Sequence, residues 1–189
     1  MNNNIENDIE RTIISREELQ NIVKRLGAEI SRDYEGKNLL MISVLKGAVV
    51  TMADLMRAVT IPCRIDFMMA SSYGSGTRTT GDVRILKDLE YSLKDYDILI
   101  VEDILDSGIT LKFIYDLLKG RGPRSVRICT LLDKPGADRR ADIKPDYVGA
   151  TVPNEFIVGY GLDYAEKYRN LPYIGVLRSE VYAKKDGDK

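Results

Sequence analysis

The sequence contains no histidine, which removes the commonest acid–base side chain and every histidine-based triad or zinc site. Any acid–base step must therefore use Asp, Glu, Lys, Tyr or Cys. Cysteine is scarce as well: Cys63 and Cys129 each lie in an apolar run, and no C-x-x-C motif occurs. This pattern predicts two buried, reduced thiols and no structural zinc site.

Net charge is almost zero, because 28 Lys and Arg face 29 Asp and Glu, which leaves −1. A dedicated nucleic-acid-binding protein usually carries a basic excess, so that class is disfavoured. No apolar run reaches the roughly 18 residues needed to span a membrane, and the polar, acidic start is unlike a secretory signal. We therefore expect a cytoplasmic protein without membrane or nucleic-acid partners. The 189 residues are 44% hydrophobic and predict one domain, 1–189.

Short apolar runs alternate with stretches of helical periodicity along the chain. Continuous apolar runs are typical of strands buried on both faces of a parallel sheet. The alternation predicts an α/β fold, with a mostly parallel central sheet flanked by helices. Ligands in such folds bind beyond the carboxyl ends of the strands. We expect helices at 16–34, 48–58 and 111–119 (ended by Gly120), and strands at 38–45, 61–70, 83–86, 97–101, 125–132, 147–150, 156–160 and 173–177.

Two segments have no apolar period. Residues 71–82 (SSYGSGTRTTGD) are rich in Gly, Ser and Thr, and predict a long loop of the kind that serves as a lid. Residues 102–110 (EDILDSGIT) follow a predicted buried strand and precede a predicted helix, so we expect a turn there. This turn carries most of the chemistry.

The turn combines carboxylates with a predicted phosphate site. Gly108 can adopt a positive φ, and the helix that follows offers free N–H groups and a positive dipole end. Ser107 and Thr110 add hydroxyl donors. Glu102 and Asp103 suit a sugar diol or Mg²⁺. Any one of these residues alone is compatible with a plain turn or helix cap, but the whole string favours a sugar phosphate bound with a divalent ion. No P-loop and no G-x-G-x-x-G motif occurs.

The string V-E-D-I-L-D-S-G-I-T (101–110) resembles the phosphoribosyl-diphosphate signature of type I phosphoribosyltransferases. Four further segments are together similar to bacterial-type hypoxanthine(-guanine) phosphoribosyltransferases. They are Leu45-Lys46-Gly47, Ser72-Tyr73-Gly74, Leu132-Asp133-Lys134, and F-I-V-G-Y-G-L-D-Y (156–164) followed by Arg169. The resemblance runs from about residue 10 to 180. It implies the type I fold, with a flexible lid and a small hood built from the N- and C-terminal segments.

The resemblance also implies an activity in purine salvage. The 5-phosphoribosyl group of phosphoribosyl diphosphate passes to N9 of hypoxanthine and/or guanine, which gives IMP or GMP and diphosphate. Mg²⁺ is the implied cofactor, and a homodimer or homotetramer is the implied assembly. Asp106 is the implied catalytic acid or base at N7 of the purine. Because the chain has no histidine, a carboxylate in this role is consistent with the composition.

The implied binding residues fall into five groups. Lys134 would donate to O6 of the base, and Phe156 would stack on it. The full assignment is phosphoribosyl binding by Glu102, Asp103, Asp106, Ser107, Gly108, Ile109 and Thr110; diphosphate binding by Lys46, Gly47 and Arg169; purine binding by Lys134, Phe156, Ile157 and Asp163; lid residues Ser72 and Tyr73; and metal binding by Glu102, Asp103 and Asp163.

Three alternatives stay open at this point. The chain could be a non-catalytic regulator that kept the sugar-phosphate site, although it retains Asp106, Lys134 and Arg169. It could act on another base. Lys134 and the 156–163 segment disfavour adenine and pyrimidines, but xanthine remains open. A generic α/β module with a metal pair at Glu102 and Asp103 would bind Mg²⁺ without affinity for a sugar diphosphate.

Overall fold

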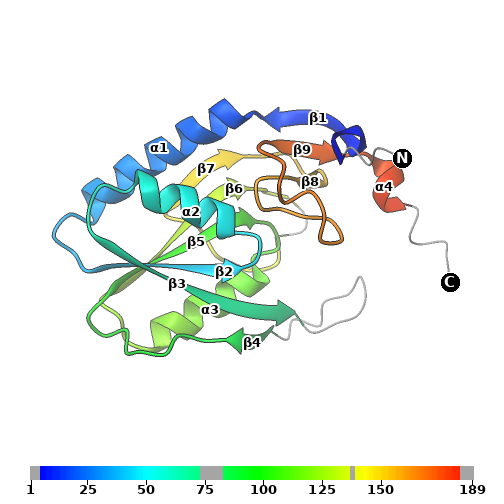
Figure 1. Cartoon of the computed structure of the whole chain (residues 1–189). Helices are drawn as coiled ribbons and strands as arrows, with labels where there is room; N and C mark the ends of the chain where they lie inside the picture. The colour runs from blue at the N-terminus through cyan, green and yellow to red at the C-terminus, as the bar shows by residue number, and fades with distance from the viewer. Residues whose placement is uncertain (1–4, 73–82, 137–138, 184–189) are drawn as a thin grey trace.

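The computed structural model describes residues 5–72, 83–136 and 139–183 (Figure 1). Its elements alternate as the sequence predicts, and the α/β fold class is confirmed. In chain order they are η1 (Ile5–Asp8), β1 (Ile9–Ile14), α1 (Arg16–Asp33), β2 (Leu39–Leu45), α2 (Val49–Ala58), β3 (Cys63–Ser72), β4 (Val83–Lys87), β5 (Asp97–Leu105), α3 (Ile109–Gly120), β6 (Ser125–Asp133), β7 (Tyr147–Thr151), β8 (Ile157–Val158), β9 (Ile174–Leu177) and α4 (Ser179–Tyr182).

The larger sheet has the strand order β4-β3-β2-β5-β6-β7 among the described residues. All neighbours pair parallel except β4, which is antiparallel to β3. The central strand β2 is buried from Leu39 to Val44. Helices cover both of its faces, which explains why its sequence is continuously apolar rather than alternating.

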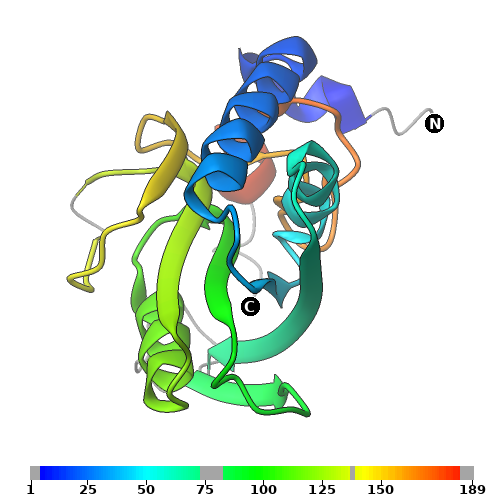
Figure 2. The ribbon, with the colours of Figure 1, turned by 90° about the vertical axis from the view of Figure 1, so that its left-hand side faces the viewer.

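Helices α1 and α2 lie on one face of this sheet, and α3 lies on the other (Figures 1 and 2). The first face buries Leu26, Met52 and Leu99, and the second buries Ile100 and Ile114. Neighbouring residues of β5 thus point into opposite cores, as the period of two requires. A capping box opens α1: Ser15 N–H donates to Glu18 Oε2 at 2.7 Å, and Glu18 N–H donates to Ser15 Oγ at 3.3 Å.

A smaller antiparallel sheet, of order β1-β9-β8 in the described residues, brings the two ends of the chain together (Figure 1). Strand β1 pairs with β9 from Ile9↔Leu177 to Ile14↔Ile174. The sequence analysis assigned no strand to the first 14 residues. Their pairing partner lies about 160 residues away in the chain, so no local pattern identifies it.

Two predicted boundaries of the lid and the turn are wrong. Strand β5 continues to Leu105, because it keeps pairing with β6 as far as Leu105↔Asp133. The carboxylates of Glu102 and Asp103 therefore lie on a strand and not in a turn. Strand β3 continues to Ser72, because β4 pairs with it at Ser71 and Ser72. The predicted loop therefore begins after Ser72, its residues 73–82 lie outside the described residues, and its role as a lid stays a prediction.

Two glycines account for further differences in boundaries. Helix α3 includes Gly120, which was predicted to end it; the left-handed residue is Gly122, with φ 71°. Strand β8 is limited to Ile157–Val158, because Gly159 follows with φ 101° and turns the chain. In both cases the predicted element is present and its end differs by one or two residues.

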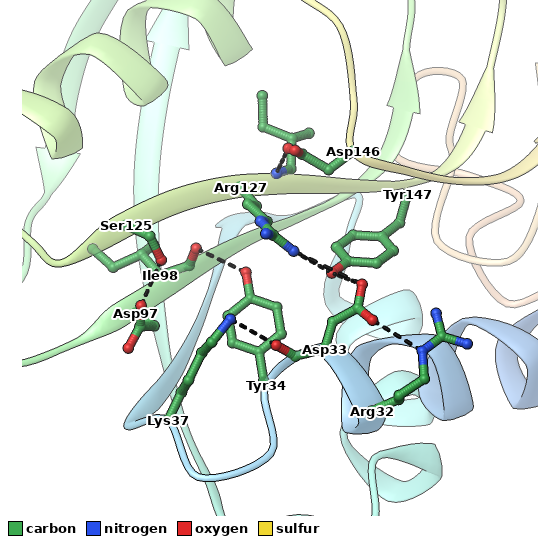
Figure 3. Close-up of polar contacts among 11 residues, drawn as sticks. Arg32, Asp33, Tyr34, Lys37, Asp97, Ile98, Ser125, Arg127, Asp146 and Tyr147 are labelled. Carbon is green, nitrogen blue, oxygen red and sulfur yellow. Dashed lines mark hydrogen bonds and ion pairs between the residues drawn. The ribbon is translucent and has the colours of Figure 1, made fainter.

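A polar network joins the end of α1 to the amino ends of the parallel strands (Figure 3). Arg127 Nη1 donates to Tyr147 Oη at 3.0 Å, and the Tyr147 hydroxyl donates to Asp33 Oδ2 at 3.0 Å. The hydrogen bond from Tyr147 lowers the pKa of Asp33, and Arg32 and Arg127 act in the same direction. Because these groups satisfy one another's hydrogen-bonding capacity, we interpret the network as structural.

Both cysteines are free thiols. Cys129 is buried, and burial raises the pKa of its thiol to about 12, as expected for an inert core cysteine. Cys63 is only partly buried, so the prediction of two buried thiols holds for one of them. Among the described residues, no helix has the length and apolar character needed to cross a membrane.

Candidate active site

Two adjoining cavities lie at the carboxyl ends of the parallel strands. The first, of about 280 Å³, is lined by the end of β5 and the start of α3. The second, of about 350 Å³, is lined by the segments that follow β2 and β6 and by residues around β8. Gly47, Asp103, Ile104 and Asp106 line both. The carboxyl edge of the sheet, where ligands of such folds bind, is therefore hollow, and the end of β5 lies where the two cavities adjoin.

The first cavity has the form of an anion cradle. Gly108 caps α3 with φ 77°, as predicted, and Ser107, Gly108 and Thr110 line the cavity at the N-terminus of the helix. Free N–H groups and the positive end of the helix dipole favour a phosphate there. Ile109, which the resemblance included in this group, lines neither cavity.

Two neighbouring carboxylates border the cradle. Burial raises the pKa of Asp103 to about 6. Burial, followed by the negative charge of Asp103, raises the pKa of Glu102 well above its ordinary value. Gly47 packs directly against Asp103: a Cβ at Gly47 would lie 2.0 Å from Asp103 Oδ2. Any larger residue at position 47 would therefore displace this carboxylate.

The carboxylate of Asp106 and the ammonium of Lys134 meet where the cavities adjoin. Lys134 Nζ lies 2.9 Å from Asp106 Oδ2. The other carboxylate oxygen, Asp106 Oδ1, is buried and has no hydrogen-bond partner in the described part of the chain. A buried acceptor without a partner is energetically costly. It therefore indicates a place where a ligand donates a hydrogen bond.

Two cationic side chains, Arg169 and Lys46, line the second cavity, and each forms an ion pair with an acidic side chain. Arg169 Nη2 pairs with Asp163 Oδ1 at 2.8 Å, and its Nη1 donates to the main-chain oxygen of Gly161 at 2.8 Å. Lys46 Nζ pairs with Glu166 Oε2 at 3.1 Å. The Leu45–Lys46 peptide bond is cis. Both cations line the cavity and suit a diphosphate there.

An aromatic side chain borders the same cavity. Phe156 is 39% exposed and lines the cavity with Ile157 and Lys134. Its ring stacks on Tyr182 of α4, with ring centroids 4.9 Å apart and planes 20° apart. It meets Tyr164 edge-on at 5.4 Å. Tyr182 does not line the cavity, so it supports Phe156 from outside.

Comparison with known proteins identifies the family. The phosphoribosyl transferase domain family matches residues 15–165, which include the cradle, the carboxylates and Lys134. The chain belongs to this family. Hypoxanthine-guanine phosphoribosyltransferase of Staphylococcus aureus is similar to it, with 51% identity over 177 residues, 94% of this chain and 98% of the relative.

Solved structures agree with this membership of the phosphoribosyl transferase family. A hypoxanthine phosphoribosyltransferase from S. aureus gives a TM-score of 0.91 at 51% identity and covers 96% of this chain and 98% of its own. One from Trypanosoma cruzi gives 0.88 at 40% identity, covering 95% and 97%. The bifunctional protein TilS/HprT of Listeria monocytogenes is 53% identical over 96% of this chain, which spans only 28% of that relative.

The structure brings most of the predicted site residues of this chain to the two cavities. Ile109 is an exception, since it lines neither of them. Of the predicted lid residues, Ser72 is the last residue of β3, and Tyr73 lies outside the described residues. The residues that do line the cavities are Lys46, Gly47, Glu102, Asp103, Asp106, Ser107, Gly108, Thr110, Lys134, Phe156, Ile157, Asp163 and Arg169.

Sequence reasoning missed three residues that shape the site. Glu166 holds Lys46, Tyr182 supports Phe156, and Glu155 lines the second cavity. Glu166 and Tyr182 act on residues distant in the chain, so no spacing pattern signals them. Glu155 could have been inferred, because it directly precedes the Phe156 segment.

The residues present fit a magnesium ion. Asp103 and Glu102 offer only carboxylate oxygens, the ligand type that Mg²⁺ prefers. The described residues contain no cluster of three or more His, Cys, Asp or Glu side chains able to hold a metal. Mg²⁺ commonly uses one or two carboxylates together with substrate phosphates, so a larger cluster is not required.

Proposed function

We propose that this chain transfers the 5-phosphoribosyl group of phosphoribosyl diphosphate to N9 of hypoxanthine or guanine. The single observation that carries the proposal is the pair of adjoining cavities, with an anion cradle in one and an aromatic side chain in the other. Asp106 and Gly47 border both. A sugar bound between them would have its phosphate in the cradle and its reacting carbon near the base.

Our proposed reaction forms a bond between N9 and C1 of the ribose as the bond from C1 to diphosphate breaks, with inversion at C1. The proton that the base loses goes to Asp106. Its buried Oδ1 is the acceptor that has no partner among the described residues. Lys46 and Arg169 stabilise the departing diphosphate, since preorganised cations act on charge that develops in the transition state.

Selectivity for 6-oxopurines follows from Lys134. Its side chain is only 13% exposed, and its ammonium carries N–H donors but no acceptor. It can donate to the O6 atom of hypoxanthine or guanine. Adenine has an amino group at that place, so the ammonium would face a donor instead of an acceptor there, and only its pairing with Asp106 would remain. A site built around one buried donor rejects such an analogue strongly.

Glu102 and Asp103 are the residues that we propose to hold Mg²⁺, and Asp163 would bind a second Mg²⁺ or its waters. The ion, when bound, neutralises charge on the diphosphate. Burial disfavours two ionised carboxylates side by side, and a cation would relieve this. Asp163 pairs with Arg169 through Oδ1 and accepts a hydrogen bond from Glu166 N–H at Oδ2.

The described chain forms one phosphoribosyltransferase domain in this proposal, with the β1-β9-β8 sheet as the hood. The assembly into a homodimer or homotetramer stays a prediction, which sedimentation equilibrium checks.

The test is a spectrophotometric assay with phosphoribosyl diphosphate, Mg²⁺ and each of hypoxanthine, guanine, xanthine and adenine. We expect turnover of hypoxanthine or guanine and none of adenine. Turnover of adenine would contradict the role of Lys134. Tight binding of phosphoribosyl diphosphate without turnover of any base would instead identify a regulator that lacks the chemistry.

A further inference from the structure

Arg139 lies in the connection after β6, and its guanidinium reaches back to the end of β5. Nε donates to the main-chain oxygen of Asp106 at 2.8 Å, and Nη2 donates to that of Leu105 at 3.1 Å. Nη2 also contacts Asp133 Oδ1 at 2.5 Å and, more weakly, the main-chain oxygen of Lys134 at 3.5 Å. One side chain therefore ties together the ends of two neighbouring strands.

These strand ends carry the two polar groups that meet between the cavities. Regular pairing of β5 with β6 stops at Leu105↔Asp133. Asp106 and Lys134 are the next residues on either strand, and their side chains are 2.9 Å apart. Among the described residues, a main-chain bond joins the two ends next to the last ladder pair, from Lys134 N–H to the Leu105 oxygen at 3.1 Å. The hydrogen bonds of the Arg139 side chain add to it.

We propose that Arg139 is a positioning residue for the transfer reaction, which fixes the carboxylate of Asp106 relative to the ammonium of Lys134. This inference rests on the proposed function. Arg139 lines neither cavity, and its contacts are main-chain oxygens and Asp133. It therefore acts through Asp106 and Lys134 and does not touch the substrates.

The chemistry of the guanidinium explains why an arginine suits this place. Its planar fork carries five N–H donors at fixed angles, so one group reaches several acceptors at once. Asp133, at 2.5 Å, compensates its charge where both side chains are only 23% exposed. A lysine at 139 would keep the charge against Asp133 but would not bridge all of these oxygens.

The adjacent Arg140 provides a matched control. Its main-chain N–H donates to the Ser107 oxygen at 2.9 Å, which any residue except proline can do. Within the described residues, its side chain makes no hydrogen bond or ion pair and lines neither cavity. This main-chain bond and the one from Ala141 to the same oxygen also hold the anion cradle, so they would keep it in place without Arg139.

The experiment compares Arg139→Gln, Arg139→Lys and Arg140→Gln with the wild-type chain by steady-state kinetics and thermal unfolding. We expect Arg139→Gln to lower kcat about 10-fold or more, since small misplacements of reacting groups are costly. The KM for hypoxanthine should rise several-fold, and the KM for phosphoribosyl diphosphate should stay within about two-fold. Arg139→Lys should show the same split to a smaller extent, and Arg140→Gln should match the wild type.

Two results would overturn the inference. One is an Arg139→Gln variant with the kinetics of Arg140→Gln. The other is equal weakening of both substrates together with a lower unfolding midpoint, which would indicate general structural damage. If Arg139→Gln does not fold, the Arg139→Lys variant tests the inference. It should lower kcat and raise the KM for hypoxanthine while the KM for phosphoribosyl diphosphate stays nearly unchanged. A wild-type chain inactive on every base would overturn the proposed function as well, so the two failures are distinguishable.

Discussion

Asp106 lines both cavities, and its buried Oδ1 has no hydrogen-bond partner among the described residues. No other described residue has both properties. We expect Asp106→Asn to lower kcat by about 10²-fold or more, because the amide cannot take the proton from the base. Binding of phosphoribosyl diphosphate should survive, since the cradle of Ser107 and Gly108 is unchanged. Steady-state kinetics and isothermal titration with phosphoribosyl diphosphate measure the two effects.

Asp95→Asn is the control for this change, because Asp95 is an exposed carboxylate that lines neither cavity. It should behave like the wild type. Unchanged turnover in Asp106→Asn would remove Asp106 from the catalytic role. Loss of both turnover and binding would assign it to the sugar-phosphate site instead.

Lys134 gives a second prediction at this scale. We expect Lys134→Ala to raise the KM for hypoxanthine and guanine by 10-fold or more, because a hydrogen bond from a charged group contributes about 1.5–3 kcal/mol. Affinity for phosphoribosyl diphosphate should change little. Lys144→Ala is the matched control, since Lys144 is exposed in the same connection and lines neither cavity. Equal losses for both substrates would contradict a base-reading role.

At the scale of elements, the short helix α4 contacts the proposed base site through Tyr182, which stacks on Phe156. Tyr182 lies against Phe156 with nearly parallel rings. We expect Tyr182→Ala to raise the KM for hypoxanthine several-fold, because a ring without this support samples orientations that stack poorly on a base. Tyr182→Phe keeps the ring and should restore the wild-type value.

Kinetics with saturating phosphoribosyl diphosphate check this prediction, and the KM for that substrate is the internal control. A wild-type KM for hypoxanthine in Tyr182→Ala would show that the orientation of Phe156 does not depend on α4. Failure of Tyr182→Phe to restore binding would point to the hydroxyl group rather than to the stack.

The same scale shows what the sequence could and could not predict. The buried strands β2 and β5 and the capped helix α1 follow from local patterns, and the cradle follows from the string around Gly108. The end of β5 does not, because Glu102 and Asp103 read as polar turn residues while pairing with β6 keeps them extended. Strand β1 and the contacts of Arg139 depend on partners that only the folded chain brings near.

For the molecule as a whole, the parallel order of strands explains why one end holds the candidate site. Segments around Lys46, Asp106, Lys134 and Phe156 are far apart in sequence and meet because they follow the carboxyl ends of neighbouring elements. At the amino ends, by contrast, polar groups such as Asp33 and Tyr147 satisfy one another (Figure 3). Polar groups with unmet hydrogen-bonding capacity, such as Asp106, therefore mark the functional end.

Burial of Glu102 and Asp103 gives the folded chain a stability that depends on pH when no metal is bound. An aspartate in the unfolded chain has a pKa of about 4. Burial raises the pKa of Asp103 in the folded chain to about 6. Between these values the folded state binds more protons than the unfolded state. The free energy of unfolding therefore falls as pH rises through this window. The pKa of Glu102 is shifted in the same direction.

Urea unfolding in a chelating buffer between pH 4.5 and 7 tests this. We expect Asp103 alone to account for a decrease of about 2 kcal/mol, from a shift of about two pKa units. Carboxylates with lowered pKa, such as Asp33, lose their contribution only as pH falls below this window. Asp103→Asn should flatten the dependence, and Asp95→Asn should not. A wild-type stability that rises with pH here would mean that the folded chain favours the ionised pair even without a cation.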